Sequence, residues 1–126
     1  MVGYSDEIFK STHKGEFERL ALKAFHFQLK HNAVYRAYIS YLGIDIHCIR
    51  DTGLIPFLPI QFFKSHNVYA AEKKAALIFT SSGTTGMITS SHPVAEPGIY
   101  IKSFTKAFEL FYGDISSYCI LALLPS

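Results

Sequence analysis

The sequence predicts an α/β fold in which an N-terminal helical hairpin precedes a partial mixed β-sheet. Three observations support this prediction. Apolar residues recur at helical spacing between residues 16 and 42, two apolar runs at 75–79 and 118–124 are typical of strands, and a Ser/Thr/Gly-rich loop follows the first run. The chain has 126 residues, 49% of them hydrophobic and 15% aromatic, which suits one small domain or part of a larger one.

The N-terminal half is predicted to be helical. A short helix is expected over residues 6–10, capped by Ser5, and a longer amphipathic helix over 16–30 after an interruption at Gly15. Asn32 is a typical N-cap for a further helix that reaches Leu42. Gly43 is placed to end that helix in the left-handed conformation.

A proline-punctuated connector follows the helices. Residues 55–60 read Ile-Pro-Phe-Leu-Pro-Ile, and two prolines so close together exclude a regular helix because each lacks an N–H donor. A single helical turn is expected over 61–66 and a short strand over 68–70.

The C-terminal half is predicted to alternate strands with one helix. We expect a buried strand at 75–79, a returning strand at 88–94, and an amphipathic helix over 100–112 that ends at Gly113. Residues 118–124 form the most apolar run and predict a core strand. Because this run lies beside the last residue, we expect a truncated sheet whose exposed apolar edge favours self-association.

Composition argues against several classes of protein. The formal charge of +2 is spread along the chain, which disfavours a nucleic-acid partner, and no segment approaches about 20 consecutive apolar residues, so no membrane span is expected. The N-terminus lacks the pattern of a secretory signal, and a cytoplasmic location is the expectation. Cys48 and Cys119 are the two cysteines of the sequence and lie outside any C-x-x-C arrangement, so neither a disulfide framework nor a zinc ribbon is indicated, and both are predicted to be buried structural residues.

Other chemical patterns in the chain are weak. None of the six histidines pairs at the H-x-x-x-H or H-E-x-x-H spacing of a metal site, so no metal ligand is assigned. The S-x-x-K pattern occurs twice, at Ser11 and Ser103, without the partner motifs that would give it a catalytic meaning.

The loop after residue 79 carries the main functional prediction. It contains five hydroxyl side chains and two glycines, namely Thr80, Ser81, Ser82, Gly83, Thr84, Thr85 and Gly86. Glycines let backbone amides approach a phosphate, and hydroxyls donate hydrogen bonds to its oxygens, so the loop is predicted to bind a nucleotide polyphosphate. It matches neither the Walker A loop nor the G-x-G-x-x-G fingerprint. The alternative is a hydroxyl-rich turn with no ligand.

A strand followed by Thr-Ser-Ser-Gly-Thr-Thr-Gly resembles the phosphate-binding signature of the adenylate-forming superfamily. Residues 55–64, Ile-Pro-Phe-Leu-Pro-Ile-Gln-Phe-Phe-Lys, look like the segment before that loop in the branch of acyl-protein synthetases and phenylacetate–CoA ligases. The helix expected over 100–112 and the run 120–126 are similar to the elements that follow it. The resemblance covers residues 50–126 and concerns the N-terminal part of such an enzyme.

The resemblance implies an ATP-dependent acid–thiol ligase. In that family a carboxylic acid attacks the α-phosphate of Mg-ATP, pyrophosphate leaves, and a thiol of CoA or of a protein cysteine captures the acyl-adenylate. ATP and Mg²⁺ are thus the implied cofactors, and residues 80–86 the implied phosphate contacts. Lys64 and His92 are possible additional contacts, because Met87 to Ser90 replace the proline and lysine that many members carry there.

The resemblance also implies a division of the chain. Residues 1–126 would be the N-terminal portion of an acyl-adenylating domain, with a helical region over 1–50 and a connector and phosphate-loop region over 51–126. Such a portion would be inactive alone, because the family's catalytic lysine and adenine pocket lie downstream. The open alternatives are a protein-interaction module and a non-catalytic nucleotide-binding module.

Overall fold

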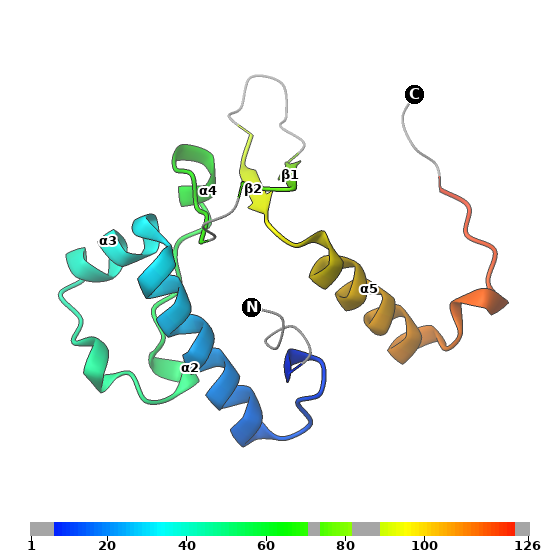
Figure 1. Cartoon of the computed structure of the whole chain (residues 1–126), viewed down its shortest axis with the longest axis horizontal. Coiled ribbons are helices and arrows are strands. Elements are labelled where there is room, and N and C mark those ends of the chain that lie inside the picture. Colours follow the sequence, from blue (N-terminus) through cyan, green and yellow to red (C-terminus); the bar gives the residue numbers. More distant parts are fainter. Residues whose placement is uncertain (1–6, 71–73, 82–88, 123–126) are drawn as a thin grey trace. The chain divides into compact units, whose positions relative to one another are not determined.

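The computed structural model describes residues 7–70, 74–81 and 89–122. The chain divides into two compact units, residues 1–96 and residues 97–126, which are considered separately below. Helices and a small antiparallel sheet make up the described part of the chain (Figure 1), so the broad α/β prediction is confirmed.

Two consecutive helices that contact each other carry the core of the first unit. Helix α2 spans Lys14–His31 and helix α3 spans Ala33–Tyr41. Phe25, with 2% of its surface exposed, packs with Tyr35, Ile39 and Ile49. The predicted helical hairpin is therefore confirmed, although α2 begins at Lys14 and takes Gly15 into its first turn.

The ends of α3 follow the predicted capping chemistry. The side chain of Asn32 accepts a hydrogen bond of 3.1 Å from the backbone N–H of Tyr35, which satisfies one of the free donors of the first turn. Gly43 has a φ of 64°, a conformation that only glycine adopts without steric cost. Its N–H donates to the carbonyl oxygen of Ser40 and closes the helix.

The segment after α3 returns along the helices without a regular helix of its own. It contains two 3-10 turns, η1 at Ile46–Cys48 and η2 at Thr52–Leu54, and η2 contacts α2. Ile55 and Leu58 of the proline-punctuated connector pack against the core. A single helical turn, α4 at Phe62–Ser65, follows as predicted.

A β-hairpin completes the described part of the first unit. Strand β1 is Leu77–Thr80 and strand β2 is Ser91–Val94, paired antiparallel with Leu77 opposite Val94 and Thr80 opposite Ser91. Pro93 lies within β2, opposite Ile78, and has no N–H to donate. Helix α4 contacts β2, so the connector is joined to the hairpin.

The second unit consists of helix α5 at Pro97–Tyr112 and the 3-10 turn η3 at Ile115–Ser117. Proline suits the first position of a helix because its missing N–H has no partner there in any case. Gly113, at a φ of 84°, ends α5 as predicted. The Tyr118 hydroxyl donates to the carbonyl oxygen of Tyr112 over 2.7 Å and ties the turn back to the helix.

Several strand predictions are wrong. Residues 118–122, the described part of the strand expected at 118–124, form no strand and are exposed, and residues 68–70 form none either. A strand needs a partner ladder, and the described sheet contains only β1 and β2, paired to each other. The sheet is therefore antiparallel rather than mixed.

The burial predicted for three elements is also wrong. All four residues of β1 are exposed, both cysteines are exposed, and aromatic residues of α5 such as Phe111 lie largely in solvent. The described residues leave β1, both cysteines and most of α5 uncovered, whereas β2 is half-buried and contacts α4. No helix within the described ranges is both long and apolar enough to cross a membrane.

Candidate functional site

The candidate site is the base of the segment that connects β1 to β2. Two hydrogen bonds join its two ends: the backbone N–H of Ser81 donates to the carbonyl oxygen of Ser90 over 3.1 Å, and the N–H of Ser90 donates to Ser81 Oγ over 2.9 Å. Ser81, which follows β1, and Ser90, which precedes β2, are therefore hydrogen-bonded to each other.

His92 extends this pair along β2. Residues two apart in a strand point to the same face, which brings the His92 ring beside the Ser90 side chain. Ser90 Oγ and His92 Nε2 share a hydrogen bond of 2.9 Å. Ser90 is buried, with 8% of its surface exposed, so this bond replaces most of the water that its hydroxyl would otherwise bind.

The outer side of the His92 ring is covered by α4. The rings of Phe63 and His92 stack with their centroids 4.7 Å apart and an interplanar angle of 24°. His92 is thus held from two sides, by the Ser90 hydroxyl and by the Phe63 ring. This contact joins α4, which follows the proline-punctuated connector, to His92, which is bonded to Ser90.

The structure places three of the predicted phosphate contacts and the lysine as follows. Thr80 is the last residue of β1 and is exposed, Ser81 belongs to the serine pair, His92 is half-buried on β2, and Lys64 is exposed on α4. Phe63 of α4 stacks on His92 of β2, and Lys64 is the next residue after Phe63. The predicted contacts at Ser82, Gly83, Thr84, Thr85 and Gly86 lie outside the described residues.

Two residues of this arrangement were not predicted from the sequence as site residues, Ser90 and Phe63. The signal for Ser90 is its spacing from His92, because a Ser-x-His pattern in a strand places both side chains on one face. Nothing in the local sequence indicates that Phe63 stacks on His92, because the two residues are 29 positions apart and meet only through the return of the chain.

The polar groups at this base are bonded to one another: the N–H groups of Ser81 and Ser90 donate within the serine pair, and Ser90 Oγ shares a hydrogen bond with His92 Nε2. Serine hydroxyls, backbone amides and an imidazole can all donate hydrogen bonds to phosphate oxygens. Within residues 7–70, 74–81 and 89–122, no three His, Cys, Asp or Glu side chains come together as a metal site would require.

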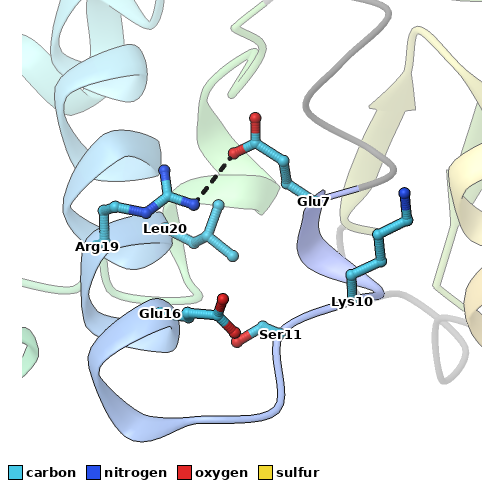
Figure 2. A pocket seen from close by; sticks show the side chains of 6 residues that line it. All are labelled: Glu7, Lys10, Ser11, Glu16, Arg19 and Leu20. Carbon is cyan, nitrogen blue, oxygen red and sulfur yellow. Dashed lines mark hydrogen bonds and ion pairs between the residues drawn. The ribbon is translucent and has the colours of Figure 1, made fainter.

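A pocket of about 200 Å³ lies elsewhere in the first unit, between the N-terminal segment and the start of α2 (Figure 2). Its lining residues are mostly charged or polar: Glu7, Lys10, Ser11, Glu16, Arg19 and Leu20. Figure 2 shows the Glu7 carboxylate directed at Arg19, and the two groups form an ion pair of 3.3 Å.

Glu7, Glu16 and Arg19 of this pocket have partners within the chain. Glu7 also pairs with Lys23 at 3.4 Å, and Glu16 Oε2 accepts a hydrogen bond from the backbone N–H of Thr12. The positive charge of Lys23, followed by hydrogen bonds from Arg19 and Lys23, lowers the pKa of Glu7. These contacts attach the N-terminal segment to α2, and we assign the pocket a structural role.

Comparison with known proteins gives no relatives for this chain: no family model matches it, and no match was found among curated proteins or among solved structures.

Proposed function

We propose that this chain is the N-terminal part of an ATP-dependent acyl-adenylating ligase. The reaction would join a carboxylic acid to AMP with release of pyrophosphate, and would then transfer the acyl group to a thiol of CoA or of a protein. The observation that carries this proposal is the sequence Thr-Ser-Ser-Gly-Thr-Thr-Gly, which begins at Thr80, the last residue of β1. Its second residue, Ser81, is hydrogen-bonded to Ser90, which precedes β2.

The geometry of the hairpin supports phosphate binding in this segment. A phosphate site works by holding donors at fixed positions, because the donors then need no reorganisation as charge develops on the leaving group. The two bonds between Ser81 and Ser90 hold together the described residues on either side of the segment.

Each predicted contact has a role in the proposed reaction. The hydroxyls and amides of residues 80–86 would surround the β- and γ-phosphates and hold pyrophosphate in line with the attacking carboxylate. Lys64, on the helical turn next to the hairpin, would add positive charge, and His92 would add a polar contact at the base. Residues of the parent enzyme outside 1–126 would supply adenine binding and the acyl pocket.

Exposed apolar side chains support a larger parent protein. On α5, Leu110 and Phe111 are 80% and 78% exposed, and Leu121 beyond η3 is 90% exposed. Single exposed apolar residues are common in proteins, but a helix and its following segment with so many are typical of surfaces covered by other polypeptide. In the proposed enzyme, the remainder of the large domain would cover them.

The same surface favours the second candidate, a protein-interaction or nucleotide-binding module without catalysis. This candidate predicts binding of ATP or of a protein partner but no exchange chemistry. The two candidates therefore differ in one measurable reaction.

Carboxylate-dependent exchange between ATP and labelled pyrophosphate tests the proposal. The assay is run on this chain and on the longer parent protein that the proposal implies, with a series of aryl and fatty acids. Exchange by the longer protein alone, abolished by Gly83→Ala with Thr84→Ala, is the expected result. A matched control is Thr12→Ala with Gly15→Ala, which replaces the same two residue types outside the loop. A Cβ added at Gly15 would meet no atom within 4 Å.

Absence of exchange by both proteins with every acid would contradict the ligase proposal. Retention of ATP binding in that case would favour the non-catalytic module. Loss of exchange in the Thr12→Ala, Gly15→Ala control would show that the effect of the loop substitutions is not local.

A further inference from the structure

We propose that His92 is a positioning residue: it fixes the base of the phosphate-binding segment through Ser90 and couples that base to α4 through Phe63. The inference rests on the proposed function, since the segment it positions is the proposed ATP site. It differs from the role of direct phosphate contact predicted for His92 from the sequence.

The contacts of His92 account for this role. Its Nε2 atom is already engaged, 2.9 Å from Ser90 Oγ, and one face of its ring is covered by Phe63. A ring held in this way fixes the Ser90 side chain, and the N–H of Ser90 is the donor to Ser81 Oγ. A chain of contacts thus runs from α4 through His92 and Ser90 to Ser81.

The bond between His92 and Ser90 does not depend on one protonation state of the ring. A hydroxyl both donates and accepts, so Ser90 Oγ can donate to a neutral Nε2 or accept from a protonated one. Burial of Ser90 makes loss of this partner costly, because its hydroxyl would be left with little water to bind. These properties suit a permanent structural restraint on the segment rather than a switch.

A second Ser–His–Phe group in the chain provides a matched control. The rings of Phe62 and His66 stack at 5.0 Å and 25°, and Ser65 Oγ shares a hydrogen bond of 2.8 Å with His66 Nδ1. This group has the same three residue types and contacts, but it is exposed at the end of α4 and does not include the two ends of the segment. Substitution of His66 therefore removes the same kinds of contact at a place that does not involve Ser81 or Ser90.

The test uses two substitutions that separate the two contacts. His92→Phe keeps an aromatic ring to stack on Phe63 but cannot bond to Ser90, whereas His92→Gln keeps a hydrogen-bonding group and loses the stack. Two properties are measured on the full 126-residue chain: amide hydrogen exchange at Ser81 and Ser90, and the dissociation constant of Mg-ATP by calorimetry. Thermal unfolding of each variant shows whether the fold is retained.

We expect His92→Phe to lower protection of the two amides and to weaken Mg-ATP binding by roughly fivefold each, which is the effect of losing one net hydrogen bond. His92→Gln should restore most of both properties, and His66→Phe should change neither. Ser90→Ala should weaken binding as His92→Phe does, and the double variant should be no weaker than either single one, because both remove the same bond.

Unchanged exchange at Ser81 and Ser90 in His92→Phe would overturn the inference without reference to any ligand. Lower protection with unchanged Mg-ATP binding would overturn the positioning role and leave the proposed function standing. A wild-type chain that binds no Mg-ATP would contradict nucleotide binding by this chain, and with it the role given to His92. An equal effect of His66→Phe would assign the result to general stability and overturn the inference.

Discussion

The Tyr35 hydroxyl donates a hydrogen bond of 2.6 Å to the backbone carbonyl oxygen of Pro56, and so joins helix α3 to the proline-punctuated connector. Its ring at the same time packs edge-on against Phe25 at a centroid distance of 6.2 Å. One side chain therefore connects the helical hairpin with the segment that leads to α4. Burial, followed by the nearby Tyr38, raises the pKa of the Tyr35 phenol.

Tyr35→Phe is expected to destabilise the chain by about 1 kcal/mol, the usual net value of one hydrogen bond. The ring is retained, so the packing against Phe25 persists and only the bond to Pro56 is lost. Urea denaturation followed by circular dichroism measures the change. Tyr41→Phe is the control, since Tyr41 is 89% exposed and should alter the free energy of unfolding little. Equal effects of the two substitutions would contradict the assignment.

Phe25→Ala is expected to cost about 3–5 kcal/mol, because it removes the most buried large side chain of the core and leaves a cavity. A loss of that size is comparable to the whole stability of a small domain, so the α2 and α3 helices should unfold. Far-ultraviolet circular dichroism measures the loss of helix. Phe17→Ala, at a position 61% exposed on the same helix, should leave the spectrum unchanged.

Cys48 is expected to react slowly with alkylating reagents despite its exposure. The hydrogen bond of its thiol with Asp45, at 3.5 Å, and the negative charge of that carboxylate raise the pKa of Cys48. A raised pKa leaves less thiolate at neutral pH, and the thiolate is the reactive form. Asp45→Asn removes the charge and retains a side-chain oxygen that can accept from the N–H of His47.

The rate of iodoacetamide labelling as a function of pH measures this effect. In a Cys119→Ser background only Cys48 is labelled, and Asp45→Asn should shift the rate profile to lower pH and speed labelling at neutral pH. An identical profile for the two proteins would show that Asp45 does not act on the thiol.

Glu7 is expected to make the attachment of the N-terminal segment sensitive to acid. Its pKa is lowered in the folded chain, first by the charge of Lys23 and then by hydrogen bonds from Arg19 and Lys23. The ionised form is therefore favoured by folding, so the stabilisation is present above the ordinary glutamate pKa of about 4.3 and is lost as pH falls through the lower folded value. Because the group is exposed, the effect should be small and reduced by salt.

Comparison of wild type with Glu7→Gln from pH 7 to pH 3 checks this prediction. The difference in their melting temperatures should shrink as pH falls below about 4.3. A constant difference, or one that grows at low pH, would contradict the sign of the effect.

The self-association expected from the apolar run at 118–124 stays a prediction, and the exposed Leu110 and Phe111 of α5 offer a second apolar surface for it. Sedimentation velocity over a range of concentrations should show a dimer or larger species. Leu110→Lys with Phe111→Lys should return the chain to a monomer, whereas Tyr41→Lys, at an equally exposed position on α3, should not. A monomeric wild type at all concentrations would contradict the prediction.

Helix ends that carry a capping residue could be predicted from the sequence because their signals are local, whereas α2 and α5 begin before the predicted residues 16 and 100. Asn32 and Gly43 each satisfy or relieve a backbone group within a few residues, so their effect does not depend on the rest of the fold. The same holds for Gly113 and for the two prolines of the connector.

Strand partners and burial could not be predicted in the same way. The run from Tyr118 to Leu124 is as apolar as a core strand, yet its described residues lie in solvent because no neighbouring strand is present to pair with them. The candidate site shows the same division. The hydroxyl-rich segment can be recognised from its residue types alone. The contact of His92 with Phe63 depends on the path of the chain between them.

Pro93 makes the two outer edges of the hairpin differ in their capacity to pair with a further strand. Ser81 and Ser90 form a hydrogen-bonded pair, and bonded and non-bonded pairs alternate along an antiparallel ladder, so the pair of Ile78 with Pro93 is non-bonded. The missing N–H of Pro93 therefore belongs to the outer edge of β2. A strand arriving at that edge would find one donor fewer, whereas the outer edge of β1 has no proline. A third strand, from this protein or from another molecule, would therefore pair more favourably on the β1 side, away from the strand that carries His92.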